Sequence, residues 1–335
     1  MGTNRRRHAL LLPVLLLVVG LAACGDDDDA APAESSGGAG GSTTTADAPD
    51  ATATPETTAA PEATGENGAD DEIGRVLAIG EETVLADLLA IGVRPIASTA
   101  TVPEVGFQGM GDLDTSGIEP LSATEPNYEY LATLEPDIIV TYEFWADIIG
   151  EDILDSLAAE QVIALEDNLP PEERVAALGD ALGRTDEAAE VVAELTAARD
   201  EVAGALGPDC ELSMATVYPG PSVAVWVEGR WEMQHTIIEA GCTLAPDASQ
   251  TDPDDNGRAW VSDEQWGLLS ATPLVLFQNE NVDGEAEALA TVEADPLWQQ
   301  VPAVEAGEVV VFDRLGYPGA VGQVRFIDEL LAELG

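Results

Sequence analysis

A pattern that occurs twice, far apart in the chain, most strongly limits what this sequence can fold into. Residues 125–140 read EPNYEYLATLEPDIIV, and residues 261–277 read VSDEQWGLLSATPLVLF. Each copy predicts a short helix that is ended by a Pro and followed by an unbroken apolar run, which is typical of a buried parallel strand. Two such units predict two α/β lobes of similar build.

Each copy also places one carboxylate, Glu129 or Glu264, in the first turn of its expected helix. Two exposed carboxylates at equivalent places, one on each lobe, would suit a molecule of pseudo-twofold shape that docks on a symmetric partner. The same acids are also favourable simply because they lie at the positive end of a helix dipole. The pattern by itself leaves both interpretations open.

The N-terminus has the features of a secretory signal peptide, which we assign to residues 1–23. Three arginines at 5–7 precede an apolar stretch at 9–23 that is too short to span a bilayer comfortably. Small residues then precede Cys24, as in a bacterial lipobox, so we expect Cys24 to be the first mature residue and to carry lipid. The mature protein would be anchored to the extracytoplasmic face of the cell membrane. A soluble secreted protein cut nearby is the alternative.

Residues 24–72 combine the expected lipidated Cys with an acidic linker that contains no Lys, Arg or aromatic residue. Its low hydrophobicity and high charge predict disorder. A flexible chain of this length has a mean reach of roughly 35–40 Å. We therefore expect the folded body to begin near Ile73 and to move above the membrane on this linker.

The folded body is strongly acidic, with 51 acidic residues against nine arginines and no Lys. Such a field repels nucleic acid and anionic surfaces, so neither is an expected partner. A surplus of acids without lysine also suggests a salt-rich habitat, where screening makes an acidic surface tolerable.

Two cysteines remain once Cys24 carries lipid, and an exported protein can oxidise them. Cys210 precedes an expected strand, and Cys242 follows an expected helix. A disulfide between Cys210 and Cys242 is the preferred interpretation, and two buried free thiols are the alternative.

The body divides into an N-terminal α/β lobe at 73–168, a helical segment at 169–207 and a C-terminal α/β lobe at 208–335. Strands that alternate with helices predict parallel pairing with right-handed crossovers. One helix of about 20 residues between Thr185 and Gly207 would join the lobes as a stiff spine. The predicted fold class is α/β, with two Rossmann-like lobes, mainly parallel central sheets and a single long connecting helix.

Most of these elements can be placed by residue number. In the N-terminal lobe we expect strands at 75–80, 94–99, 137–141 and 161–166 and a helix at 81–92. In the C-terminal lobe we expect strands at 213–227 and 308–313 and helices at 232–240 and 320–334.

Four stretches carry a resemblance to a known family: LLAIGVRPIAS at 88–98, EPNYEYLATLEPDIIV at 125–140, LGRTDEAAEVVAEL at 182–195 and DPLWQQVPAVEAGEVVVFD at 295–313. The chain resembles the substrate-binding lipoproteins of iron-complex ABC importers, which capture ferric siderophores, haem or cobalamin and have a rigid helix between their lobes. The last stretch is the most specific, because its Trp after Pro-Leu and its Ala-Val ahead of Gly and a strand are not required by α/β folding alone.

The resemblance implies a function and its partners. Such a protein would capture a ferric siderophore in the cleft between its lobes and deliver it to an ABC permease dimer with its ATPase. It would be a monomer without catalysis and without a cofactor or metal of its own. Haem or cobalamin binding is the alternative within this class, and a surface enzyme or adhesion module that reuses the fold is the alternative outside it.

The resemblance also gives the two carboxylates a role. Glu129 and Glu264 match positions that in this family face arginines on the permease dimer. Charge-assisted pairs between Arg and carboxylate would fix the orientation of the docked protein.

Aromatic and arginine side chains on loops at strand ends are the candidate ligand-binding residues, because rings can grip a rigid chelate and guanidinium groups can pair with its oxygens. An ordinary surface or core position remains the alternative for each of them. Some hydroxamate binders of the family carry an Arg where this chain has Ala123, so the resemblance does not extend to hydroxamate specificity. The candidates are Phe107, Tyr142, Phe144 and Trp145 in the N-terminal lobe and Arg230, Trp231, Arg258, Trp260, Arg314 and Tyr317 in the C-terminal lobe.

His235 is the only histidine left after removal of the signal peptide, and its place in an expected helix favours a structural role. Capture of bare zinc or manganese ions normally needs several His and carboxylate ligands, and His-based hydrolysis is equally poorly supplied. No phosphate loop, nucleophile elbow or dinucleotide-binding Gly fingerprint is present in the sequence. These observations argue against binding of free metal ions and against the corresponding enzymes.

Overall fold

The structure, a computed structural model, describes residues 73–220, 222–229 and 232–334. The expected signal peptide, Cys24 and the acidic linker lie outside the described residues, and so do Arg230 and Trp231. All described residues belong to one unit of the chain, Thr64–Gly335. None of the helices in this part of the chain is both long and apolar enough to cross a membrane.

The N-terminal lobe is built on a five-stranded parallel sheet whose strand order is β3-β2-β1-β4-β5. Ala78 of β1 lies opposite Ser98 of β2 on one side and opposite Val140 of β4 on the other. The strand order reverses between β1 and β4, as it does at the ligand-binding edge of doubly wound α/β folds. The strands are β1 (Val76–Ile79), β2 (Ala97–Ala100), β3 (Glu119–Ser122), β4 (Ile138–Tyr142) and β5 (Gln161–Leu165).

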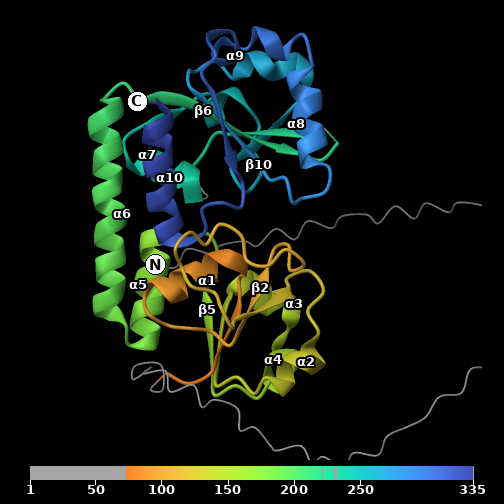
Figure 1. Ribbon diagram of the computed structural model, residues 1–335, viewed down its shortest axis with the longest axis vertical. Coiled ribbons are helices and arrows are strands. Elements are labelled where there is room, and N and C mark those ends of the chain that lie inside the picture. Colours follow the sequence, from red (N-terminus) through yellow and green to blue (C-terminus); the bar gives the residue numbers. More distant parts are fainter. Residues whose placement is uncertain (1–72, 221, 230–231, 335) are drawn as a thin grey trace, which may run out of the picture. The chain divides into compact units, whose positions relative to one another are not determined.

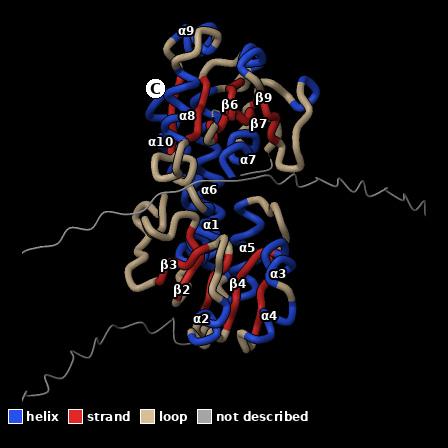
Figure 2. The backbone as a smooth tube through the Cα atoms, turned by 90° about the vertical axis from the view of Figure 1, so that its right-hand side faces the viewer, coloured by secondary structure: helices blue, strands red, loops and turns tan. Residues whose placement is uncertain are grey.

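Helices cover both faces of this sheet, because successive strand residues point to opposite sides. Val76 belongs to a buried cluster with Leu178 of α5, whereas its neighbour Leu77 belongs to a separate cluster with Leu131 of α2. Figure 2 shows these strands running side by side with helices around them. The helices are α1 (Glu81–Ala90), α2 (Tyr128–Thr133), α3 (Glu143–Ile149), α4 (Glu151–Ser156) and α5 (Pro171–Leu182).

The C-terminal lobe has a mixed sheet with the order β11-β10-β6-β7-β9, and the short β8 pairs with β6 outside this path. Strand β10 is parallel to β11 and β6, whereas β7 is antiparallel to β6 and β9. The expected strand region at 213–227 is therefore a hairpin of two strands, and Gly220, with a φ of 83°, turns the chain after β6. The strands are β6 (Glu211–Tyr218), β7 (Ser222–Trp226), β8 (Thr243–Leu244), β9 (Arg258–Val261), β10 (Leu274–Gln278) and β11 (Val309–Asp313).

The two copies of the repeated pattern differ in helix type. The first copy forms the α-helix α2, which Asn127 caps by accepting a hydrogen bond from Tyr130 N. The second copy forms the 3-10 helix η3, which at six residues is longer than most helices of this type. The other helices of this lobe are α7 (Glu232–Glu239), α8 (Glu285–Glu293), α9 (Pro302–Ala306), η2 (Ala248–Gln250), η3 (Asp263–Leu268) and η4 (Trp298–Gln300).

Two long helices, α6 (Thr185–Leu206) and α10 (Gly319–Leu334), belong to both lobes and lie side by side (Figure 1). In α10, Ala320 is part of the N-terminal core, whereas Phe326 is part of the C-terminal core. In α6, Leu195 is part of the N-terminal core and Val202 is part of the C-terminal core. The expected connecting helix is α6, and the last helix, α10, packs across both lobes as well.

A disulfide joins Cys210 and Cys242. It lies next to the parallel pair of β6 and β8, in which Glu211 is opposite Thr243. Because α7 is within the loop that this bond closes, the disulfide holds α7 against the sheet of the C-terminal lobe.

Candidate functional site

A pocket of about 730 Å³ opens at the carboxyl ends of β1 and β4, where the strand order of the N-terminal sheet reverses. Ligands of open α/β sheets bind at such a position because the loops diverge there and leave a crevice. The N-terminal lobe contributes the loops after β1, β4 and β5 and the start of α5. The C-terminal lobe contributes Gly229, Glu232, His235 and Asn256.

Aromatic side chains form one wall of the pocket. Tyr142 is the last residue of β4, and Phe144 and Trp145 follow in the first turn of α3, so the end of one strand brings all three to the pocket. The rings of Phe144 and Trp145 meet edge to face with centroids 5.5 Å apart, and Phe144 remains 56% exposed. Phe144 N donates a hydrogen bond to Asp167 Oδ1 (3.0 Å), which ties the wall to the loop after β5. Such a wall can cover the apolar face of a rigid ligand.

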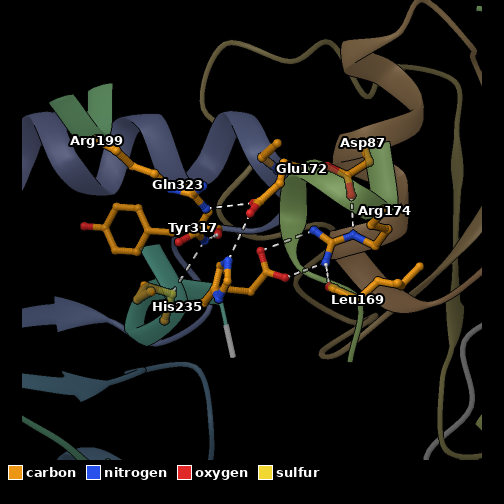
Figure 3. Close-up of polar contacts among 11 residues, drawn as sticks. Asp87, Leu169, Glu172, Arg174, Arg199, His235, Tyr317 and Gln323 are labelled. Carbon is orange, nitrogen blue, oxygen red and sulfur yellow. Dashed lines mark hydrogen bonds and ion pairs between the residues drawn. The ribbon is translucent and has the colours of Figure 1, made fainter. Parts of the chain in front are cut away.

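A buried arginine, Arg174 of α5, forms part of the pocket and connects the two lobes (Figure 3). Its Nε donates to Asp87 Oδ2 of α1 (2.5 Å), and its Nη1 donates to Glu232 Oε1 of α7 (2.7 Å). Asp87 also accepts a hydrogen bond from Ala320 N at the start of α10 (2.8 Å). Burial raises the pKa of Asp87, and the charge of Arg174 opposes this rise. The positive charge of Arg174 is therefore neutralised by carboxylates of the protein itself.

A second ionic cluster lies beside the first. Glu172 of α5 accepts a hydrogen bond from Arg199 Nη2 of α6 (2.8 Å), and its other oxygen lies 3.1 Å from His235 Nε2 of α7 (Figure 3). Burial would raise the pKa of Glu172, but the hydrogen bonds to His235 and Arg199 outweigh it, and the pKa is lowered. The same hydrogen bond raises the pKa of His235. His235 thus has the structural role expected from the sequence, but it also lines the pocket.

Glu81, the first residue of α1, lines the pocket directly after β1. Its φ of 58° is in the left-handed region, which a residue other than Gly rarely adopts. Thr99 Oγ1 accepts hydrogen bonds from Gly80 N and Glu81 N and so holds this turn in place. Burial raises the pKa of Glu81, and the charge of Glu82 adds to this effect. The turn presents a partly desolvated carboxylate to the pocket.

Two arginines of the C-terminal lobe, Arg258 and Arg314, form a cluster around Tyr218 at the end of β6. The Arg314 guanidinium lies 5.4 Å from the centre of the Tyr218 ring, and Arg258 Nη1 donates to the Tyr218 hydroxyl (3.4 Å). Each arginine has a carboxylate partner: Arg258 pairs with Asp254 (3.0 Å), and Arg314 pairs with the buried Glu285 (2.6 Å). These pairs hold the guanidinium groups in fixed positions.

The family model for periplasmic binding proteins matches residues 77–314, which is most of the chain and reaches from the first strand of one lobe to the last strand of the other. The chain belongs to the periplasmic binding protein family. This membership agrees with the two α/β lobes and with the pocket at the strand ends. No curated protein sequence matches this binding protein significantly.

Solved structures of other binding proteins with their bound ligands share the fold of this binding protein. SirA from Staphylococcus aureus in complex with staphyloferrin B has a TM-score of 0.64 at 18% identity, over 78% of this chain and 92% of that one. FhuD from Vibrio cholerae with bound Fe3+-Desferal has a TM-score of 0.62 at 18% identity, over 78% and 98% of the two chains. FeuA from Bacillus subtilis in complex with ferri-bacillibactin has a TM-score of 0.62 at 19% identity, over 77% and 91%. At these identities the likeness shows the fold alone.

The structure brings together only part of the expected ligand-binding set. Tyr142 and Trp145 line the pocket of the binding protein, together with Phe144. Arg258, Trp260 and Arg314 are absent from its lining among the described residues and form the neighbouring cluster instead. Arg258 and Trp260 also lie on β9 rather than on a loop, because this segment pairs with β7. Arg230 and Trp231 lie outside the described residues.

Two expected ligand residues are packing residues. Tyr317 is only 6% exposed, and its ring packs against Phe312 (5.8 Å between centroids) and Phe326 (5.4 Å) in the C-terminal core. Its assignment to the ligand site is wrong, because the loop after β11 turns into α10 and carries the ring inward. Phe107 packs against the cluster that contains Leu85 and is not among the residues that line the pocket.

Several pocket residues of the binding protein were not expected from the sequence. Glu81 could have been found, because it follows the first strand at the point where the strand order reverses. Glu232 and Asn256 gave no such signal, since their positions depend on how α7 and the loop before β9 pack against the other lobe.

The two carboxylates of the repeated pattern lie apart from the pocket. Glu129 is exposed in the first turn of α2, and Glu264 is exposed in the first turn of η3. Each lobe therefore carries one of them at its surface, as the repeated pattern predicts.

Proposed function

We propose that this chain is the extracytoplasmic substrate-binding component of an ABC importer and that it captures a ferric siderophore in the pocket between its lobes. The observation that carries the proposal is the pocket itself, about 730 Å³ in volume and walled by Tyr142, Phe144 and Trp145. It has the size of a small-molecule site. The structurally similar proteins SirA, FhuD and FeuA were each solved with an iron-siderophore ligand or its siderophore.

In this role the residues of the pocket bind and orient, and no bond of the ligand is broken. The rings cover apolar parts of the chelate, and the polar groups of Asn168 and Asn256 are available for its amide and oxygen atoms. We propose no resident cofactor, because the iron arrives and leaves as part of the ligand. Among the described residues, no group of three or more His, Cys, Asp or Glu side chains is placed to hold a metal ion.

Delivery would use the two exposed carboxylates, Glu129 and Glu264. Arginines on the two halves of a permease dimer would pair with them and fix the orientation of the binding protein. The rigid connection of the lobes by α6 and α10 supports this role, since it keeps the two carboxylates at a constant separation.

The sequence supports a membrane anchor for the same protein. Lipid on Cys24 would hold the chain at the extracytoplasmic face of the cell membrane, with residues 25–72 as a linker. Replacement Cys24→Ala should release the protein from the membrane fraction, as seen by fractionation and immunoblotting. Retention of this variant in the membrane fraction would contradict the anchor.

Iron uptake tests the proposed function. Cells that lack the chain should lose import of a ferric siderophore that it binds, and the wild-type chain should restore the import. The double variant Glu129→Ala/Glu264→Ala should bind the siderophore with unchanged affinity but fail to restore uptake. As a matched control, Glu135→Ala/Glu293→Ala removes two acids outside the proposed docking positions and should restore uptake fully. Lost affinity in the first double variant would show that the docking assignment is wrong.

A further inference from the structure

The charge of the pocket carries information about its ligand. Among the described residues, three carboxylates line the pocket, those of Glu81, Asp167 and Glu232, against one guanidinium, that of Arg174, and one imidazole, that of His235. In this described lining, acidic groups outnumber basic groups.

The basic groups of the pocket are also occupied. Arg174 is 2% exposed and donates to Asp87, Glu232 and the carbonyl of Leu169. His235 is hydrogen-bonded to Glu172, which Arg199 contacts as well. Turning Arg174 toward a ligand would leave the buried carboxylate of Asp87 without a counter-ion, which is costly. Neither group is free to neutralise an anionic ligand.

The arginines of the neighbouring cluster, Arg258 and Arg314, are likewise not free to neutralise an anionic ligand. Arg258 is paired with Asp254, and Arg314 is paired with Glu285, which is fully buried. Arg314 is close enough to Glu81 for its charge to oppose the rise in the pKa of Glu81. The positive charge of each of these arginines is therefore already balanced by a carboxylate of the protein. Arg230 lies outside the described residues, and the sequence places Glu228 and Glu232 two residues to either side of it.

The charge of the whole chain also disfavours anionic ligands. The formal net charge is −52 at pH 7. The negative field of such a chain attracts ligands of positive charge and slows the association of ligands of negative charge. Ferric siderophores differ widely in this property. Three hydroxamates neutralise Fe3+, whereas three catecholates, each doubly charged, leave the complex with three negative charges.

We propose that the pocket selects a ferric chelate without net negative charge, namely a tris-hydroxamate complex, and excludes tris-catecholate complexes. This assignment rests on the proposed function, because it names the ligand class of the same site. A linear tris-hydroxamate that retains a terminal ammonium group suits the site best, since Glu81 and Asp167 offer that group a carboxylate beside the aromatic wall. The rings of Phe144 and Trp145 take up the methylene segments of the same ligand.

Three ferric complexes test this selection by quenching of tryptophan fluorescence. Fe3+-Desferal carries a terminal ammonium group, its N-acetylated form is the same chelate without that charge, and ferri-bacillibactin is an anionic tris-catecholate. We expect Fe3+-Desferal to bind about tenfold more tightly than its N-acetylated form, the size of one charge-assisted hydrogen bond. We expect ferri-bacillibactin to bind at least about 100-fold more weakly than Fe3+-Desferal.

A protein variant identifies the carboxylate that pairs with the ammonium group of the ligand. Glu81→Gln should remove most of the roughly tenfold preference for Fe3+-Desferal over its N-acetylated form, so that the two complexes bind this variant with similar affinity. Asp167→Asn provides a second variant if Glu81→Gln does not fold. Glu190→Gln, which removes an exposed acid of α6, is the matched control and should keep the preference.

The outcomes separate this inference from the function on which it rests. Binding of ferri-bacillibactin as tight as that of Fe3+-Desferal, or tighter, would overturn the charge selection and leave siderophore capture in place. Equal affinity for Fe3+-Desferal and its N-acetylated form in the wild-type protein would overturn the role of the carboxylates. No response to any ferric chelate would overturn the proposed function and this inference with it.

Discussion

At the scale of single residues, Arg174 links carboxylates of the two lobes. It is 2% exposed and contacts carboxylates on α1 and α7, while Asp87 also receives the N–H of Ala320. A buried charge is stable only when it is paired, so loss of Arg174 would leave Asp87 inside the protein without a counter-ion.

The variant Arg174→Leu is expected to lower the free energy of unfolding by about 3–5 kcal/mol, because it breaks a buried ion pair by removing one partner. Urea denaturation followed by circular dichroism measures this loss. The control is Arg94→Leu, which removes an arginine that pairs with the exposed Asp114 and should cost about 1 kcal/mol or less. Equal losses in the two variants would contradict the importance of the buried pair.

The pair of His235 and Glu172 gives the stability a pH dependence. The raised pKa of His235 means that its contribution is complete below its ordinary value of 6.5 and is lost as the pH rises through the raised value. The lowered pKa of Glu172 means that its contribution is complete above its ordinary value of 4.5 and is lost as the pH falls through the lowered value. The pair is therefore most stabilising between pH 4.5 and pH 6.5.

This window predicts the behaviour of His235→Gln. The difference in unfolding free energy between the wild-type protein and this variant should be largest at about pH 5–6 and should shrink toward about pH 9. Urea titrations at a series of pH values measure it. Arg199 and Glu239 also act on His235, with opposite signs, and both remain in the variant. A difference that stays constant over this range would show that the pair does not titrate as described.

Sequence reasoning finds some of the site residues and cannot find others. Tyr142 and Trp145 were predictable, because they directly follow a recognisable buried strand. The role of Arg174 was not predictable, because its partner Asp87 is 87 positions away in the sequence and its partner Glu232 is 58 positions away. Tyr317 was misassigned because an aromatic residue after a strand can turn inward as readily as outward.

At the scale of elements, helices α5 and α6 approach each other closely at Gly179. A Cβ built on Gly179 would lie 2.5 Å from the Ala188 Cβ and 2.9 Å from the Arg184 carbonyl oxygen. Gly204, also inside a helix, has no atom within 4 Å of such a Cβ. A side chain at position 179 would therefore clash with α6, whereas a side chain at position 204 would meet no other atom.

Replacing these glycines by alanine should change the stability in opposite directions. Gly179→Ala should lower the free energy of unfolding by roughly 1–3 kcal/mol, because the helices must move apart. Gly204→Ala should raise it by about 0.5–1 kcal/mol, because alanine favours the helix. Thermal and urea denaturation test both variants. Stabilisation by Gly179→Ala would contradict the close packing of α5 against α6.

The elements themselves were mostly predictable, and their partners were not. The expected helix between Thr185 and Gly207 matches α6, because helical spacing and a terminal Gly are local signals. The antiparallel pairing of β7 was not expected, because the sequence analysis did not identify the turn between β6 and β7, and the other partner, β9, lies much farther along the chain. The same holds for α10, whose apolar residues give no indication that they divide between two cores.

At the scale of the whole molecule, the formal net charge of −52 sets the conditions under which the protein is stable. Repulsion among so many carboxylates opposes folding, and salt screens it. Added NaCl should therefore raise the midpoint of thermal unfolding. Scanning calorimetry between low and high salt measures the shift. A midpoint that does not rise with salt would remove the proposed link between the acidic surface and a salt-rich habitat.

Capture of a ferric siderophore in the interlobe pocket is the central claim, and an equilibrium titration of the folded protein with ferric chelates tests it most directly. Emission of the tryptophans reports on the pocket, because Trp145 is part of its wall. We predict saturable quenching with one binding site and a dissociation constant of about 1 μM or below for at least one ferric siderophore, and weaker quenching in Trp145→Leu. Unchanged emission throughout a panel of ferric hydroxamates, catecholates and carboxylates would contradict the claim, and a response to haem or a corrinoid alone would assign the pocket to that ligand instead.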